Sequence, residues 1–149
     1  MSSDHTHAKN QHRAQEPSPE PPVNAQGKAY DPDASTDERS FAMFMHLALL
    51  LNLTGVGGVV AFIVVLVMWI TRKDESAFLD DHGREAMNFQ ISLFIWGLIL
   101  TFGAIVTCGA SLLFLIVIPI VGAIGMVLAA MAANRGEFFR YPATFRFIH

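Results

Sequence analysis

Two long stretches of the chain contain no charged residue. Residues 40–71 and 86–134 lack Asp, Glu, Lys and Arg altogether, and small residues interrupt each stretch near its middle. The Lys and Arg residues lie only before, between and after these stretches. A charge-free stretch that can cross a bilayer and return, with small residues at its midpoint, predicts a membrane hairpin. The pattern therefore predicts an all-α, polytopic membrane protein with four transmembrane helices arranged as two hairpins.

Capping signals place the ends of these helices. Ser35 followed by Glu38 fits a capping box, which starts the first helix, and Gly136 is a suitable stop for the last. The expected helices cover residues 36–53, 57–72, about 80–106, and 111–134.

The first hairpin is the weaker prediction. The charge-free part of each of its helices is about 14 residues, or about 21 Å, against a hydrocarbon core of about 30 Å. The alternative is one helix through residues 40–71. At about 48 Å that helix would need an unusually large tilt, and it would hold three glycines at mid-length. Four crossings fit these lengths better.

Composition agrees with lipid as the main solvent. The chain is 52% hydrophobic and 15% charged, whereas a soluble domain carries about 25% charged residues. A net charge of -3 does not suggest nucleic acid as a partner. The single cysteine, Cys108, excludes an internal disulfide and a multi-cysteine metal site.

The two ends of the chain differ in composition. Residues 1–34 are polar and rich in His, Gln, Pro and Ser, so we expect a disordered cytoplasmic arm. Residues 35–149 should form the membrane domain, with an aromatic and arginine-rich C-terminal segment at the lipid interface. The positive-inside rule places both termini in the cytoplasm of a bacterial cell, with the domain in its inner membrane.

A polar stripe marks the expected third helix. Asp81, Glu85, Asn88 and Ser92 follow at steps of four, three and four, so they share one helical face. Two interpretations stay open. The stripe could line a polar path or a cation site together with His82, or it could face the bundle interior, with its amide and hydroxyl bonding between helices.

Further candidate positions lie elsewhere in the apolar stretches. His46, about two turns into the first helix, is either a neutral imidazole bonded to a neighbouring helix or a ligand or proton relay. Combined with His82 and Asp81, it gives the hypothesis of a membrane-embedded metalloenzyme. Small residues at steps of four on the last helix favour close helix packing or assembly. They are Gly125, Ala129 and Ala133.

Several short motifs occur together in this chain. They include DER at residues 37–39, KDES at 73–76, DHGREAMNFQIS at 81–92 and ANRGE at 133–137. In combination they resemble the Tic-twenty-like family of small bacterial membrane proteins, over residues 35–148. The resemblance implies a four-helix membrane protein distantly similar to a subunit of the chloroplast inner-envelope import machinery, which is thought to help form a protein-conducting channel. It implies no catalytic residue.

The sequence contains no phosphate-binding loop, nucleophile elbow or paired metal ligands at helical spacing, so we expect neither an enzyme nor a cofactor. We expect an integral membrane protein that acts as an assembly or translocation-type subunit, as a homo-oligomer or with a membrane protein partner. The alternative is a small solute or ion conduit lined by the polar stripe.

Overall fold

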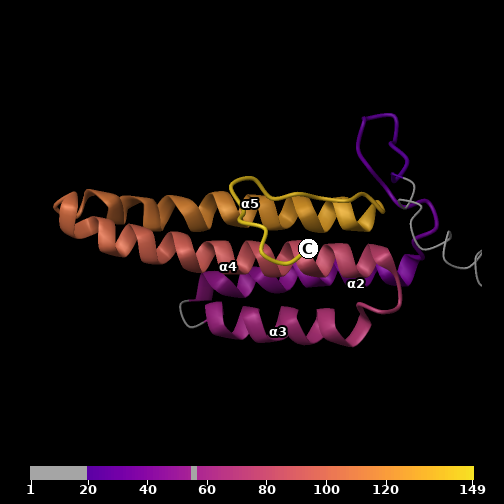
Figure 1. Ribbon diagram of the computed structural model, residues 1–149, viewed down its shortest axis with the longest axis horizontal. Coiled ribbons are helices and arrows are strands. Elements are labelled where there is room, and N and C mark those ends of the chain that lie inside the picture. The colour runs from indigo at the N-terminus through magenta and orange to yellow at the C-terminus, as the bar shows by residue number, and fades with distance from the viewer. Residues whose placement is uncertain (1–19, 55–56) are drawn as a thin grey trace, which may run out of the picture.

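The computed structural model describes residues 20–54 and 57–149. Within these residues the chain forms four α-helices and two short 3-10 helices, so the all-α prediction is confirmed. In chain order they are α2 (Thr36–Ala48), η1 (Leu49–Thr54), α3 (Gly57–Arg72), α4 (Ala77–Val106), η2 (Ala110–Leu113) and α5 (Phe114–Asn134). The helices form two hairpins, α2/α3 and α4/α5, which lie side by side (Figure 1).

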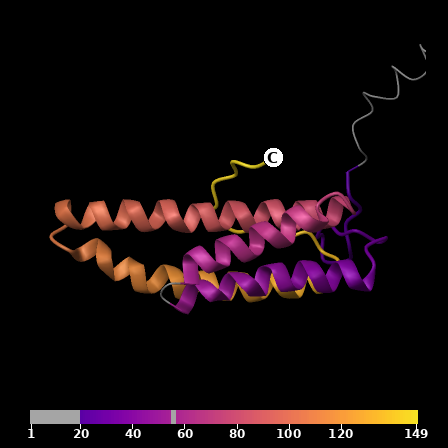
Figure 2. The ribbon, with the colours of Figure 1, turned by 90° about the horizontal axis from the view of Figure 1, so that it is seen from below.

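The two hairpins differ in length. Helix α4 has 30 residues and α3 has 16, which correspond to about 45 Å and 24 Å. The long hairpin therefore extends well beyond the short one at one end of the molecule (Figures 1 and 2). In the described part of the chain, only α4 and the continuous stretch Ala110–Asn134 are long and apolar enough to cross a membrane. The prediction of four crossings is not confirmed, because the helices of the first hairpin are too short.

Local capping explains where the helices begin and end. The predicted capping box is confirmed, since Ser35 Oγ accepts from the Glu38 amide at 3.2 Å and Glu38 Oε2 accepts from the Ser35 amide at 2.7 Å. Helix α4 begins earlier than predicted, at Ala77, because Ser76 Oγ accepts the amide of Leu79. Gly136 ends α5 as predicted.

The end of α5 is a Schellman motif. Gly136 has a φ of 75°, and its amide donates to the carbonyl of Ala133 while the amide of Glu137 donates to Ala132, each at 2.9 Å. A positive φ is accessible to glycine without steric cost, so this position can reverse the chain. The reversal directs residues 138–149, which we call the C-terminal segment, back along α4 and α5 (Figure 1).

A pair of side-chain amides holds the tip of the first hairpin. Asn52 Nδ2 donates to Gln90 Oε1 at 2.8 Å, and Gln90 Nε2 donates to Asn52 Oδ1 at 2.9 Å and to the Gly58 carbonyl at 3.0 Å. Gln90 lies near the middle of α4 and is almost completely buried. The short hairpin therefore turns halfway along α4, where these amides satisfy its backbone.

Tight packing joins the hairpins at their other end. The ring of Trp69, on α3, lies directly over Gly83 of α4, where a β-carbon would overlap it. Trp69 Nε1 also donates to Asp80 at 2.9 Å. Helix α2 packs on both α4 and α5, and Met45 of α2 and Leu49 of η1 are fully buried in the two hydrophobic clusters of the core. These contacts hold the four helices together at the end of the bundle that carries the polar residues.

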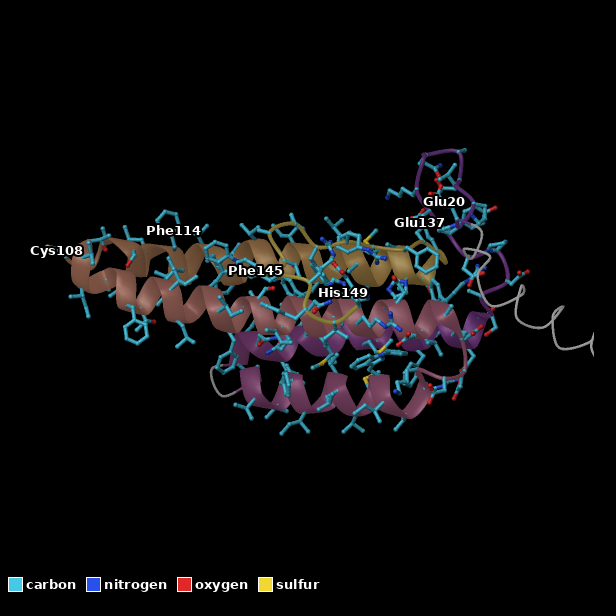
Figure 3. The ribbon with its side chains drawn as sticks, viewed as in Figure 1. Glu20, Cys108, Phe114, Glu137, Phe145 and His149 are labelled. Atoms are coloured by element: carbon cyan, nitrogen blue, oxygen red, sulfur yellow. The ribbon has the colours of Figure 1, made fainter. Side chains whose placement is uncertain are left out.

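Polar and apolar surfaces are separated along the long axis. Every ion pair among the described residues joins groups from residues 28–37, 72–85 or 135–146, which gather at one end. The opposite end is the turn of the long hairpin, where Ile105 and Val106 are 80% and 86% exposed. Figure 3 shows Cys108 and Phe114 at this apolar end and Glu20 and Glu137 at the charged end.

Part of the predicted disordered arm has defined contacts. Residues 20–34 form a loop in which Val23 pairs with Ala29, and Tyr30 pairs with Glu137 beyond α5. The rest of the predicted arm, including His5, His7 and His12, lies outside the described residues. The boundary between arm and membrane domain at residue 34 stays a prediction.

Candidate functional site

The polar stripe of α4 lies under the C-terminal segment. All four of its predicted members contact this segment, each through a different group. Asp81 accepts two hydrogen bonds from the Arg140 guanidinium, at 2.6 and 2.7 Å. Glu85 Oε1 accepts from the Tyr141 amide at 2.6 Å, and Arg146 lies 3.4 Å from each carboxylate oxygen.

The amide and the hydroxyl of the stripe bind the backbone of the same segment. Asn88 Oδ1 accepts from the amides of Phe147 and Ile148, and Asn88 Nδ2 donates to the Ile148 carbonyl, all at 2.9 Å. Ser92 Oγ accepts from the Phe145 amide at 2.8 Å and donates to the Asn88 carbonyl at 2.7 Å. An irregular segment against apolar helices needs such partners, because unpaired backbone groups away from water are costly.

His46 and His82, predicted from different parts of the sequence, meet in the core. His46 Nε2 lies 2.9 Å from His82 Nδ1, and His46 Nδ1 lies 2.9 Å from the Tyr141 hydroxyl. Both imidazoles are fully buried. The three side chains thus form a continuous hydrogen-bonded chain from His82 on α4 through His46 on α2 to Tyr141 in the C-terminal segment.

One proton arrangement satisfies this chain best. In this arrangement the Tyr141 hydroxyl donates to His46 Nδ1, and His46 Nε2 donates to His82 Nδ1, so both hydrogen bonds are made. The N–H hydrogen of neutral His82 is then on its Nε2 atom. The reverse direction would leave the buried hydroxyl without an acceptor. His82 Nε2 is buried and has no hydrogen-bond partner among residues 20–54 and 57–149. Burial raises the pKa of the Tyr141 phenol well above its ordinary value, and the nearby Glu85 charge adds to this.

Asp81 does not join the two histidines, although the metalloenzyme hypothesis grouped all three. Asp81 pairs with Arg140 instead, and both ring nitrogens of His46 are hydrogen-bonded, one to His82 and one to Tyr141. The described residues contain no group of three or more His, Cys, Asp or Glu that could hold a metal. The geometry therefore supports a hydrogen-bonded clasp for the C-terminal segment.

A second polar cluster lies at the end of α5. Glu137 accepts from Arg135 at 2.8 Å and from Asn24 at 3.0 Å, and Lys28 lies 3.4 Å away. The bond from Arg135, followed by that from Lys28, holds the pKa of this carboxyl below its ordinary value, against the opposing effect of burial. Glu137 thus ties the loop of residues 20–34 to the end of the second hairpin.

The small residues of α5 are used inside the chain. Ala129 and Ala133 are completely buried in the two core clusters, where α2 packs on α5. Gly125 lies beneath the ring of Tyr141, with room for an ordinary van der Waals contact. In this structure the three positions let α2 and the C-terminal segment approach α5 closely.

Sequence reasoning did not single out two of the central groups. Gln90 lies within the motif of residues 81–92 and Tyr141 within the aromatic C-terminal segment, and the sequence predicts no partner for either. Gln90 is the one amide-bearing residue on α4 besides Asn88, which could have marked it as a partner for Asn52. No local signal connects Tyr141 with His46, because 95 residues separate them.

The comparison with protein families gives a different result from the motif resemblance. Residues 37–148 match the magnetosome magnetite crystal formation protein family, MamF/MmsF. Neither the curated proteins nor the solved structures contain a significant match to this chain. The assignment to a Tic-twenty-like family is therefore wrong, because the motifs that suggested it lie within the MamF/MmsF match. Since this match covers well over half of the sequence, the chain belongs to the magnetosome magnetite crystal formation protein family.

Proposed function

We propose that this protein is a non-enzymatic subunit of the membrane that surrounds a forming magnetite crystal. In this role the α4/α5 hairpin anchors it in the bilayer, and the charged end forms a rigid surface that assembles with further copies or with a membrane protein partner. Family membership supports the link to crystal formation. The observation that carries the anchoring role is the separation of the ion pairs at one end from the exposed apolar residues at the other.

The positions of the basic residues support an orientation. The Lys and Arg residues that form ion pairs lie at the charged end, and the turn of the long hairpin, residues 107–113, carries none. By the positive-inside rule we place the charged end and the C-terminus on the cytoplasmic side and Cys108 on the far side. Because Cys108 is the single cysteine and is exposed, a membrane-impermeant maleimide tests this placement. We expect labelling only after the magnetosome membrane is opened; labelling of intact magnetosomes would reverse the orientation.

A solute or ion conduit along the polar stripe is less well supported. Such a path needs polar groups that are free to face it, whereas Glu85, Asn88 and Ser92 bind the backbone of the C-terminal segment. We expect no flux through the protein in reconstituted liposomes. A flux of ions that disappears in Asn88→Leu would favour the conduit over our proposal.

Cross-linking in isolated magnetosome membranes tests the assembly role. Mass measurement after mild-detergent extraction should give a homo-oligomer or a stable complex with another membrane protein. In cells that lack the gene, the full chain should restore crystal size, measured by electron microscopy, in proportion to its amount. A strictly monomeric protein, or full restoration by trace amounts as expected of a catalyst, would contradict the proposal.

A further inference from the structure

An apolar cavity lies where the C-terminal segment crosses the long hairpin. Its volume is about 420 Å³, within the range of about 300–1,000 Å³ that is usual for small-molecule sites. Phe89, Leu93 and Trp96 line it from α4, Val121 and Gly122 from α5, and residues 141–144 from the C-terminal segment. The walls therefore come from the two helices that are long enough to span a bilayer and from the segment clasped onto them.

The walls select an apolar occupant. Almost no polar surface lines the cavity, so water would find no hydrogen-bond partners there. Val121, at the margin of the cavity, is 58% exposed, so the cavity is continuous with a surface that faces hydrocarbon when α5 spans the membrane. The occupant that reaches such a cavity from its surroundings is the acyl chain of a membrane lipid.

Charges beside the cavity indicate the headgroup. Arg140 and Arg146 flank the wall-forming residues 141–144, and both guanidinium groups lie at the level of the Asp81 and Glu85 carboxylates. Phe89 and Trp96 lie about one and three helical turns beyond Glu85 on α4, toward the apolar end. A lipid chain that enters the cavity would therefore have its phosphate on the side of the arginines.

The two arginines are held differently. Arg140 makes two short bonds with Asp81, whereas Arg146 is 3.4 Å from both oxygens of Glu85, whose short bond goes to the Tyr141 amide. The side chain of Arg146 is 43% exposed. Arg146 can therefore turn toward a phosphate without leaving a buried carboxylate unpaired, since Glu85 keeps its backbone donor.

We propose that this cavity binds one acyl chain of an anionic phospholipid, with the lipid phosphate at Arg146. The bound lipid fills the space between α4, α5 and the C-terminal segment and stabilises the clasped position of that segment. In the bilayer the affinity comes from packing in the cavity and from the phosphate–guanidinium pair, because transfer from lipid to cavity gives no hydrophobic gain. The inference rests on the proposed anchoring of α4 and α5 in the bilayer and does not depend on the role in crystal formation.

Native mass spectrometry of the full chain tests the chain-binding part. The protein is extracted in mild detergent and incubated with dioleoyl phosphatidylglycerol in that detergent before measurement. We expect one retained phospholipid per chain. Val121→Trp, which fills the cavity margin, should reduce retention by roughly tenfold, which corresponds to about 1.4 kcal/mol of lost packing. Ile120→Trp is the matched control, since Ile120 is 59% exposed on the same helix and does not line the cavity.

Each other outcome overturns the proposal. Equal retention in the two tryptophan variants would show that bound lipid is not in the cavity, and no retention in the natural chain would exclude a resident lipid. If Val121→Trp abolishes a dimer instead, the cavity belongs to a subunit interface. Thermal unfolding of both variants checks that they fold equally well, and if Val121→Trp does not fold, Val117→Phe replaces it at the same cavity wall.

A second set of measurements tests the headgroup. Competition between dioleoyl phosphatidylglycerol and dioleoyl phosphatidylcholine should favour the anionic lipid in the natural chain. Arg146→Gln should remove this preference. Arg84→Gln should keep it, because Arg84, which is about as exposed as Arg146, pairs with Asp80 of its own helix. The proposal of an anionic headgroup fails if the natural chain retains both lipids equally or if both glutamine variants behave alike.

Discussion

The two hairpins of this protein differ in length and in how their turns are held. In the long hairpin α4 is a regular α-helix of 30 residues, and its outer half exposes aliphatic residues such as Leu98 and Ile105. The short hairpin changes to a 3-10 helix after Ala48 and turns where Asn52 and Gln90 pair. Helix length and a buried amide pair, more than hydrophobicity, decide how far each hairpin reaches.

This difference is most visible in where polar groups are used. On the long hairpin, the polar half of α4 binds the C-terminal segment. The apolar half packs mainly on η2 and α5 of the same hairpin and leaves residues such as Ile99 and Ile105 exposed. The short hairpin covers only the polar half. Both hairpins expose apolar residues, such as Val59 on α3 and Ile105 on α4. They differ in length, because only the helices of the long hairpin are long enough to cross a membrane.

One arginine introduced into each hairpin should have the largest effect, because it distinguishes the hairpin that is long enough to cross a membrane from the one that is not. Leu98 on α4 and Phe44 on α2 are 54% and 55% exposed, so the substitutions are matched. Leu98→Arg should reduce membrane insertion, because an arginine at the centre of a spanning helix costs about 2.5–3.5 kcal/mol. Phe44→Arg should insert normally. Carbonate extraction of membranes measures both, and an equal loss would restore the model of four crossings.

Removing the clasp should have the next largest effect. Asn88→Leu removes three hydrogen bonds to the C-terminal segment, at a net cost of about 0.5–1.5 kcal/mol each. Hydrogen exchange should accelerate in residues 145–149 while the tip of the short hairpin stays protected. Thr101→Val, which removes an exposed α4 hydroxyl, is the control. Unchanged exchange in the segment would mean that packing alone holds it.

Separating the hairpins at Gly83 should destabilise the protein somewhat less. Gly83→Ala places a methyl group into the Trp69 ring, and such overpacking costs about 1–3 kcal/mol. Gly97→Ala, on the same helix with open space around it, should be neutral or stabilising. Thermal unfolding in detergent compares them. If both alanines behave alike, α3 and α4 do not depend on this close approach.

The smallest effect should come from Glu137, which links the loop of residues 20–34 to the long hairpin. Its pKa is lowered in the folded protein, so its stabilisation is present above the ordinary value of 4.5 and is lost as pH falls through the folded value. The loss should be about 1 kcal/mol or less, since Arg135 and Lys28 are about half exposed. Limited proteolysis of the loop between pH 7 and pH 3 measures it. In Glu137→Gln the loop should be equally accessible at both pH values.

Much of the fold was accessible from local patterns. The bounds of α3, the capping box at Ser35 and the stop at Gly136 agree with prediction, because each depends on residues within one or two helical turns. Helix α4 starts three residues before the predicted start near residue 80, because Ser76 caps it at Ala77. The stripe was found from helical spacing, but spacing could not say what it faces.

The sequence by itself determined that this chain has two charge-free hairpins, that its ionic groups lie outside them, and which residues share a face of α4. These properties follow from composition and from the 3.6-residue period of a helix. Only the tertiary structure decided that the first hairpin stops at Gln90, that His46, His82 and Tyr141 join, and that the C-terminal segment occupies the stripe. Those contacts link residues 36 to 95 positions apart, and no local pattern can select such a pairing because it depends on how the helices pack.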